Sequence, residues 1–375
     1  MPQLRRITSG SSWIPQIDGL RFVAIMSVVL FHLSGEVHVR GLYPVAIPTA
    51  WPQALFNFTN GDRGVWCFFV ISGFILARPF LRQYRLGGHP VQLGAYFLRR
   101  VTRLEPPYIL MLLLSLFAAY LMFPISLKER LPHLLASIFY VHNLFLPHGV
   151  PINFVLWTLE IEVQFYILAP LMGNLYRIEN TVLRRSIFAL LVLASGFGSL
   201  FLSPYFHGTL LYYAQYFFAG FLLADLLEYP RYSNHESWSW DLVSVAGWPI
   251  VFFLPRLPAT EAWLPLVLIP LYLAAFRGKL SNWFFRHPLI ALTGGMCYSI
   301  YLTHVMSMSI SYRLVKYVRV GGETTSPIVQ LLLLLVPTLL GGLVYFVLIE
   351  RPCMDPKWPL KLWCWVRGRE SEITI

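Results

Sequence analysis

Long apolar runs recur along the whole chain, and short polar segments that carry most of the charges separate them. A helix needs about 20 apolar residues to cross a bilayer. Ten runs approach that length and predict membrane-spanning helices near residues 17–37, 64–82, 104–125, 153–173, 186–203, 209–228, 240–256, 262–276, 289–311 and 327–349. A further run at 131–146 is short and contains polar side chains, which favours an interfacial or re-entrant segment.

Composition excludes a soluble or disordered protein. Charged residues make up 13% of the 375 residues and hydrophobic residues 57%, whereas a soluble domain has about 25% charged residues. The class expected is an all-α polytopic membrane protein that forms a single transmembrane domain over residues 1–375, with a core at about 15–352 and a short basic cytoplasmic tail at 353–375. The cysteines are scattered, which argues against a disulfide framework or a metal site: Cys67, Cys297, Cys353 and Cys364.

The basic residues predict the orientation of the chain. With a cytoplasmic N-terminus and no span at 131–146, the inner segments hold 20 Lys and Arg and the outer ones 8. If 131–146 spans, the counts become 12 and 16. The positive-inside rule therefore favours about ten spans with both termini in the cytoplasm. Because the first run itself carries charges, we expect a retained span rather than a signal peptide.

The first span carries a stripe of ionisable residues, which are costly inside a bilayer. Arg21 and His32 are eleven residues apart, so on a helix they share one face and lie about 16 Å apart along its axis. Asp18 and Glu36 fall on the same stripe. We expect this stripe to face the bundle interior or a water-filled cavity. The alternative is structural: an Asp18–Arg21 ion pair at the inner interface, with His32 satisfied by a neighbouring helix.

Three arginines precede the third span: Arg99, Arg100 and Arg103. Guanidinium groups suit phosphate, so the cluster predicts an anionic ligand, while lipid headgroups and topology are the alternatives. The prolines at 106–107 fit the start of the next helix. In the next cluster Glu160 and Glu162 are two residues apart, so they should point to different faces.

Six motifs, in this order, resemble those of the acyltransferase-3 family of integral membrane acyltransferases. They are Ile17-Asp18-Gly19-Leu20-Arg21 with His32; Gly64-Val65 with Phe68-Phe69-Val70-Ile71-Ser72-Gly73-Phe74; Arg99-Arg100-x-x-Arg103-Leu104-x-Pro106-x-Tyr108; Trp157-Thr158-Leu159-x-x-Glu162-x-x-Phe165-Tyr166; Tyr298-Ser299-x-Tyr301-Leu302-x-His304; and Glu350-Arg351-Pro352. Thr158 stands where the family usually has Ser. Because the chain ends soon after the last span, the expected form is the one without an extra extracytoplasmic domain.

The resemblance implies transfer of an acyl group, often acetyl, from cytoplasmic acyl-CoA to a hydroxyl of a glycan, a lipid-linked sugar or a small natural product. No bound cofactor and no nucleic acid are expected, membrane lipids surround the protein, and the expected location is a bacterial inner membrane. His32 is then the leading general base, with Glu36 or Glu162 orienting it. The acyl-CoA would lie against Arg21, Arg99, Arg100 and Arg103, with supporting roles for Asp18, Ser72, Tyr301 and His304.

Two other classes stay open at this point. A polar stripe with a histidine and carboxylates also suits a proton-coupled transporter of a small polar solute, although the internal repeat common in transporters is not evident. A scaffold or lipid-binding module would make every one of these polar groups structural.

Overall fold

The computed structural model describes residues 13–40, 60–122, 126–146, 151–228, 236–318, 320, 325–355 and 358–359. Every regular element within these ranges is a helix, which confirms the all-helical class. Most of the expected tail at 353–375 lies outside them. The α-helices are α1 (Pro15–Arg40), α3 (Gly64–Arg85), α4 (Leu93–Met122), α5 (Leu127–Ile138), α6 (His142–Phe145), α7 (Trp157–Gly173), α8 (Thr181–Ser199), α9 (Leu210–Glu228), α10 (Trp238–Phe253), α11 (Pro258–Trp263), α12 (Pro265–Arg277), α13 (Lys279–Arg286), α14 (Pro288–Gly295), α15 (Cys297–Val315), α16 (Thr325–Tyr345) and α17 (Arg351–Cys353).

Several of these helices can cross a membrane. In the described residues seven stretches are long and apolar enough, and the pair α14 and α15, bent by 70°, makes an eighth if it counts as one span. The seven comprise α1, α3, α4, α8, α9, α11 with α12, and α16. α7 and α10 are shorter, with 17 and 16 residues. The chain is therefore a multi-pass helical membrane protein, and each of the ten apolar runs of the sequence contains a helix.

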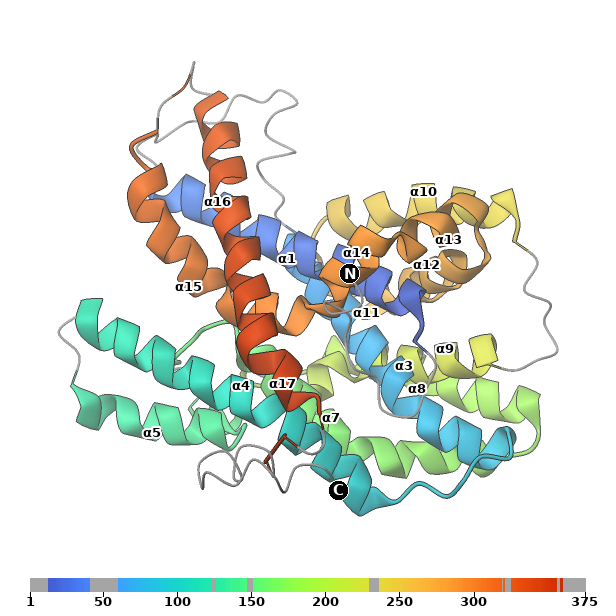
Figure 1. The fold of residues 1–375 in the computed structure, drawn as a ribbon. Coiled ribbons are helices and arrows are strands. Elements are labelled where there is room, and N and C mark those ends of the chain that lie inside the picture. Colours follow the sequence, from blue (N-terminus) through green and yellow to red (C-terminus); the bar gives the residue numbers. More distant parts are fainter. Residues whose placement is uncertain are drawn as a thin grey trace, which may run out of the picture.

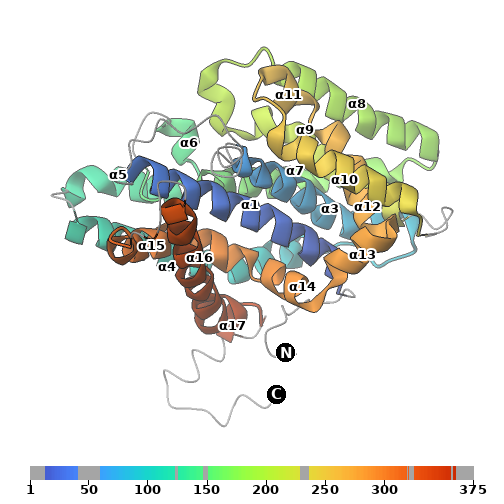
Figure 2. The same ribbon diagram turned by 90° about the horizontal axis from the view of Figure 1, so that it is seen from above.

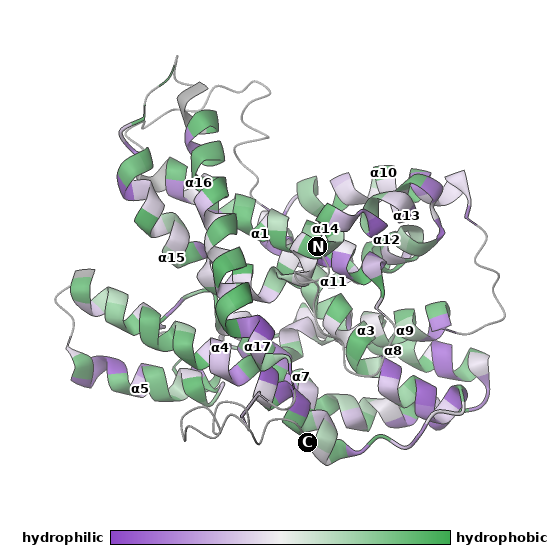
Figure 3. Ribbon diagram, viewed as in Figure 1, coloured by the Kyte–Doolittle hydropathy of each residue, from purple (hydrophilic) through white to green (hydrophobic). Residues whose placement is uncertain are grey.

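The outside of the bundle suits a hydrocarbon environment. Figure 3 shows hydrophobic residues along most of α4 and α16. Large apolar side chains on α4, α8 and α16 are exposed, among them Phe117, Leu121, Leu190 and Leu340. Exposing such an extended apolar surface to water would cost free energy, whereas contact with lipid tails carries no such cost.

α3 lies at the centre and packs closely against α9. A Cβ atom on Gly73 would lie 2.2 Å from the carbonyl oxygen of Phe217, and one on Gly220 would lie 2.3 Å from that of Val70. Both distances are far below contact, so only glycine fits where the two helices cross. Phe165 of α7 stacks on Phe217 with ring centroids 4.2 Å apart. On another side of α3, Figure 2 shows α1 running alongside it.

α4 begins earlier than the sequence predicted. It starts at Leu93, so the expectation that the prolines at 106–107 open the helix is wrong. A proline has no N–H for the carbonyl one turn earlier, here that of Thr102. The indole N–H of Trp358 donates to that carbonyl at 2.9 Å instead. The helix therefore continues through the prolines, and the arginine cluster at 99–103 lies on a helix rather than in a loop.

The short run at 131–146 forms no continuous helix. α5 ends at Ile138, and the chain turns at Tyr140, whose φ of 56° is the one positive value at a non-glycine residue in the described part. With 12 residues α5 is about 18 Å long, whereas a bilayer's hydrocarbon core is about 30 Å thick. Figure 1 shows α5 lying alongside α4. The helix is too short to span alone, in agreement with an interfacial or re-entrant segment.

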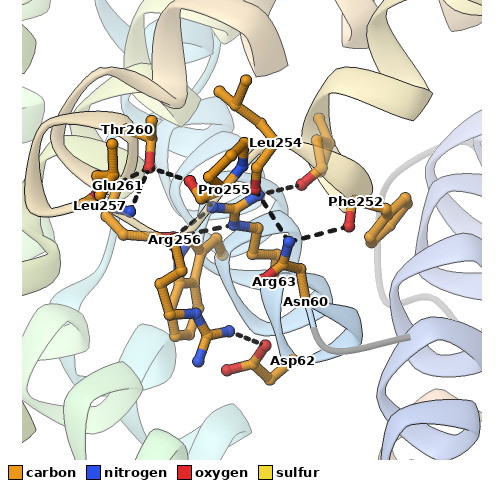
Figure 4. A network of polar contacts seen from close by, with 12 residues as sticks. Asn60, Asp62, Arg63, Phe252, Leu254, Pro255, Arg256, Leu257, Thr260 and Glu261 are labelled. Atoms are coloured by element: carbon orange, nitrogen blue, oxygen red, sulfur yellow. Dashed lines mark hydrogen bonds and ion pairs between the residues drawn. The ribbon is translucent and has the colours of Figure 1, made fainter. Parts of the chain in front are cut away.

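A buried polar network fixes the start of α3 to the connection between α10 and α11 (Figure 4). The fully buried Arg63 donates from Nε and Nη2 to one oxygen of Glu261, at 3.0 and 2.6 Å. Its Nη1 donates to the carbonyls of Val251 and Leu254, at 2.8 Å each. The indole of Trp66 donates to the other oxygen of Glu261 at 2.5 Å. Both charges are thus compensated inside the protein, which is the condition for burying them.

Candidate active site

A cavity of about 560 Å³ lies among α1, α3, α4, α7 and α15. Six arginines from α1, α3 and α4 line it: Arg21, Arg78, Arg82, Arg99, Arg100 and Arg103. Among the lining residues that the structure describes, Glu162 is the one carboxylate. A concave site with this excess of guanidinium groups attracts an anionic ligand, and arginine forks match phosphate geometry.

The structure divides the residues singled out in the sequence into two groups. Seven of them line the cavity: Arg21, Ser72, Arg99, Arg100, Arg103, Glu162 and Tyr301. Four others lie outside its lining: Asp18, His32, Glu36 and His304. Arg21 and His32 lie on one continuous helix, α1, but only Arg21 lines the cavity.

Asp18 and Arg21 form the ion pair considered as the structural alternative. Nη1 of Arg21 donates to Oδ1 of Asp18 at 2.6 Å, and the indole of Trp13 donates to Oδ2 at 2.8 Å. The guanidinium still reaches the cavity wall. Asp18 thus holds a cationic side chain in the cavity, so structure and ligand binding are compatible uses of the same pair.

Two further ion pairs connect cavity arginines to other helices. Arg78 donates from Nε to Oε1 of Glu228 at the end of α9. Arg103 lies 3.5 Å from Oε1 of the fully buried Glu350. The other oxygen of Glu350 accepts hydrogen bonds from the backbone N–H and the hydroxyl of Ser299, at 3.1 and 2.6 Å. The closing motif of the sequence thus reaches the cavity through Arg103.

Glu162 and Glu160 have separate surroundings, as their spacing predicts. Oε1 of Glu162 accepts hydrogen bonds from the hydroxyls of Ser72, at 2.5 Å, and Tyr166, at 2.7 Å. Glu160 is buried and accepts from the backbone N–H of Asn143 with both oxygens, at 2.9 and 3.1 Å. Glu162 therefore belongs to the cavity wall, held by α3 and its own helix, while Glu160 fixes the segment around α6.

The two histidines of the candidate site meet each other. Nε2 of His304 lies 3.0 Å from Nδ1 of His32, and Nδ1 of His304 lies 2.7 Å from the carbonyl oxygen of Tyr301. A carbonyl oxygen only accepts, so Nδ1 of His304 carries the proton in that contact. Nε2 of the neutral His304 then accepts, and Nδ1 of His32 donates. His32 also forms a hydrogen bond with the backbone of Val28, one turn earlier on α1. The assignment puts the lone pair of His32 on Nε2, the state that a general base requires.

A hydrogen-bonded wall separates the histidine pair from the cavity. The hydroxyl of Tyr301 donates to the carbonyl of Val155 at 2.5 Å and lies 2.7 Å from the hydroxyl of Thr158. Tyr301 and Thr158 both line the cavity. The ring of His304 lies behind them, with its centroid 5.6 Å from that of Tyr301. On a further side His32 contacts Phe154 edge to face, at 5.6 Å between centroids.

Arg78, Arg82 and Tyr140 line the cavity but were not among the candidate site residues of the sequence. Arg78 and Arg82 are four residues apart on α3, so they lie on the face that also carries Ser72 toward the cavity. That spacing is visible in the sequence, where both residues stand upstream of the arginine cluster at 99–103. Tyr140 reaches the cavity from the turn after α5, and no local pattern marks it.

Comparison with known proteins points to one family. A family model described as an acyltransferase domain matches residues 14–347. The chain is similar to the peptidoglycan O-acetyltransferase OatA of Listeria monocytogenes, with 30% identity over 179 residues, which are 44% of this chain and 25% of the relative. It is also similar to YrhL of Bacillus subtilis, a candidate peptidoglycan O-acetyltransferase, with 30% identity over 203 residues, 50% of this chain and 28% of the relative.

A candidate O-acetyltransferase of Staphylococcus aureus is 30% identical over 167 residues, which are 42% of this chain and 24% of the relative. These matches span about a quarter of the length of the curated relatives. No solved structure matches the chain.

Proposed function

This chain belongs to the acyltransferase domain family, and we propose that it is a membrane O-acyltransferase that takes an acetyl group from cytoplasmic acyl-CoA. The acceptor is a hydroxyl of a glycan, of a lipid-linked sugar or of a small natural product. The names of the relatives, which describe O-acetyltransferases of peptidoglycan, support acetyl as the group and a cell-envelope glycan as the acceptor.

The observation that carries the proposal is the order of groups along one path. Arginines line the cavity, and beyond its wall of Tyr301 and Thr158 lies the His304–His32 pair. Acyl-CoA has the matching order, with phosphates at one end and a thioester at the other. The pantetheine arm would lie along α1, where Arg21 and His32 are about 16 Å apart along the axis.

In this mechanism Nε2 of His32 removes the proton of the acceptor hydroxyl. The alkoxide oxygen attacks the thioester carbonyl, the new C–O bond forms and the C–S bond breaks. The proton then passes from His32 to the CoA thiolate, so CoA leaves as a thiol and His32 is regenerated. His304 holds the tautomer of His32 that makes the first step possible. The Tyr301–Thr158 wall must part for the thioester to reach His32.

The proposed topology has ten spans, with both termini in the cytoplasm of a bacterium and the protein in its inner membrane. The eight spans counted with the bent pair and the two shorter helices α7 and α10 support that number. The positive-inside distribution supports the orientation. In this orientation the arginines of α3 and α4 lie at the cytoplasmic end, where acyl-CoA is available.

The test uses the purified protein in nanodiscs with radiolabelled acetyl-CoA and a lipid and glycan extract of the host. We expect label to move into a product that contains no CoA, and excess unlabelled acetyl-CoA to suppress the signal. The labelled product identifies the acceptor. If the protein neither transfers label nor binds acetyl-CoA saturably, the proposed function is wrong.

A further inference from the structure

The six cavity arginines differ in how far their charge is already compensated. Arg21, Arg78 and Arg103 each have a carboxylate partner, in Asp18, Glu228 and Glu350 respectively. Their side chains are 11%, 13% and 25% exposed, so little of each is open to solvent. With a protein carboxylate on each, these three position a ligand but add little net charge.

Arg100 is held by aromatic rings. Its guanidinium carbon lies 3.8 Å from the ring centroid of Tyr96 and 5.3 Å from that of Tyr166. Nη1 also donates to the carbonyl of Tyr96 at 2.9 Å. Cation–π contacts fix the plane of a guanidinium without neutralising it, and here they leave its remaining N–H groups for the cavity.

Among the described residues, neither a close carboxylate nor an aromatic ring holds Arg82 or Arg99. Arg82 lies 3.9 Å from Oε2 of Glu228, at the limit of an ion pair, and its side chain is 36% exposed. Arg99 is exposed, and no hydrogen bond or ion pair holds it among the residues that the structure describes. They come from α3 and α4, which the short segment 86–92 joins at this end. These two solvent-accessible guanidinium groups, one without a carboxylate partner and one with a distant partner, can therefore bind a ligand at the exposed side of the cavity.

We infer that Arg82 and Arg99 bind a dianionic phosphate monoester, the 3′-phosphate of the acyl-CoA nucleotide. The inference rests on the proposed function. In acyl-CoA the 3′-phosphate is the charged group farthest from the thioester, so it occupies the exposed end when the thioester points toward Tyr301. The diphosphate then falls deeper, against Arg78, Arg100 and Arg103. Two arginine forks can saturate the oxygens of a phosphate monoester.

Arg82 and Arg99 should therefore make the cavity specific for a donor that carries the 3′-phosphate. A donor without the 3′-phosphate leaves Arg82 and Arg99 uncompensated and loses several charge-assisted hydrogen bonds, while its diphosphate contacts stay the same. The protein should therefore discriminate CoA from 3′-dephospho-CoA in binding, before any chemistry takes place. An anionic lipid headgroup offers the same phosphate chemistry, so the test must separate the two sources.

The experiment measures equilibrium binding of CoA and 3′-dephospho-CoA to the protein in phosphatidylcholine nanodiscs, with and without phosphatidylglycerol. The variants are Arg82→Gln, at a half-exposed position, and Arg99→Gln, at an exposed one, and neither should disturb folding. Arg85→Gln is the matched control, because Arg85 lies in the last turn of the same helix, outside the cavity lining, and donates to the carbonyl of Arg177 at 3.0 Å.

We expect the wild type and Arg85→Gln to bind CoA at least about tenfold more tightly than 3′-dephospho-CoA. Arg82→Gln and Arg99→Gln should bind the two ligands with nearly equal affinity. Equal affinities in the wild type, or a preference that survives in both variants, would overturn the inference while leaving acyl-CoA as the donor.

Two other outcomes also count against it. If the wild type prefers neither ligand and the two substitutions change only the retention of phosphatidylglycerol, the pair is a lipid headgroup site. If the wild type binds neither CoA nor 3′-dephospho-CoA, the proposed function itself fails.

Discussion

Nε2 of His304 lies 3.0 Å from Nδ1 of His32, and in the proposed mechanism this contact leaves Nε2 of His32 to act as the base. His304 comes from α15 and His32 from α1, so the relationship depends on the packing of two distant helices. A neutral histidine in this position fixes the tautomer and ring orientation of His32 but adds no negative charge. We therefore assign His304 a positioning role.

Replacing His304 should show whether it orients His32 for acyl transfer without contributing to the binding of acetyl-CoA. In His304→Phe no side-chain acceptor faces Nδ1 of His32, so we expect acyl transfer to fall by about tenfold to a hundredfold, with the Kd of acetyl-CoA unchanged. His304→Gln can still accept through its amide oxygen and should restore part of the rate. Single-turnover rates and equilibrium binding in nanodiscs measure the two effects.

A matched control exists in the second histidine pair of the molecule. Nδ1 of His133 lies 3.0 Å from Nε2 of His142, and neither residue lines the cavity. His142→Phe should leave the transfer rate of folded protein near that of the wild type. Equal loss in His142→Phe and His304→Phe would mean that His304 acts only through stability.

The stripe on the first span shows what a local pattern can predict. Its prediction needs only that residues 17–37 form one continuous helix, and α1 is continuous from Pro15 to Arg40. The structure then puts Arg21 at the cavity and His32 one side chain beyond its wall. The partner of His32 was not predicted from the sequence, which suggested Glu36 or Glu162 as the orienting residue, whereas the structure places His304 against it.

The buried charges at the start of α3 show what local pattern cannot supply. Arg63 was counted as an outer loop residue, but its partner Glu261 lies 198 positions further along the chain. Such a pairing depends on the packing of α3 against the α10–α11 connection, which no periodicity reveals. The same holds for Arg78 and Glu228, which are 150 positions apart.

The Arg63–Glu261 pair should be essential for stability. Arg63→Leu leaves the buried carboxylate of Glu261 with Trp66 as its remaining side-chain donor, and we expect a loss of about 3–5 kcal/mol in the free energy of unfolding. Arg256→Gln is the control within the same network (Figure 4), because Arg256 pairs with Asp62 at the surface and is 47% exposed. Exposed pairs contribute below about 1 kcal/mol. Denaturant unfolding in detergent distinguishes the two, and equal losses would contradict the burial argument.

The glycine crossing of α3 and α9 makes an independent prediction about packing. Gly73→Ala places a methyl group 2.2 Å from the backbone oxygen of Phe217, which cannot move away without its helix. We expect a loss of about 1–3 kcal/mol in the free energy of unfolding. Gly198→Ala in α8 meets nothing within 4 Å and should be neutral or stabilise by up to about 1 kcal/mol. Thermal unfolding midpoints that rank the two variants in the opposite order would refute this packing.

The stability of the fold should also depend on pH, because His142 of α6 is buried. Burial, together with the neighbouring His133, lowers the pKa of His142 below the usual value of about 6.5. The unfolded chain then binds more protons than the folded chain, so the free energy of unfolding decreases as the pH falls through about 6.5. His142→Gln should lose less stability than the wild type between about pH 7.5 and 5.5. Identical pH profiles would show that other groups dominate.

The most direct test of the central claim measures acetyl-CoA binding and acyl transfer on one variant, His32→Gln, in the same nanodisc preparation. We expect the Kd of acetyl-CoA to stay within about twofold of the wild type, because the arginine cavity is intact, while transfer of label falls by about a hundredfold or more. Transfer at the wild-type rate by folded His32→Gln would contradict the assignment of His32 as the base and remove the link between the cavity and the histidine pair.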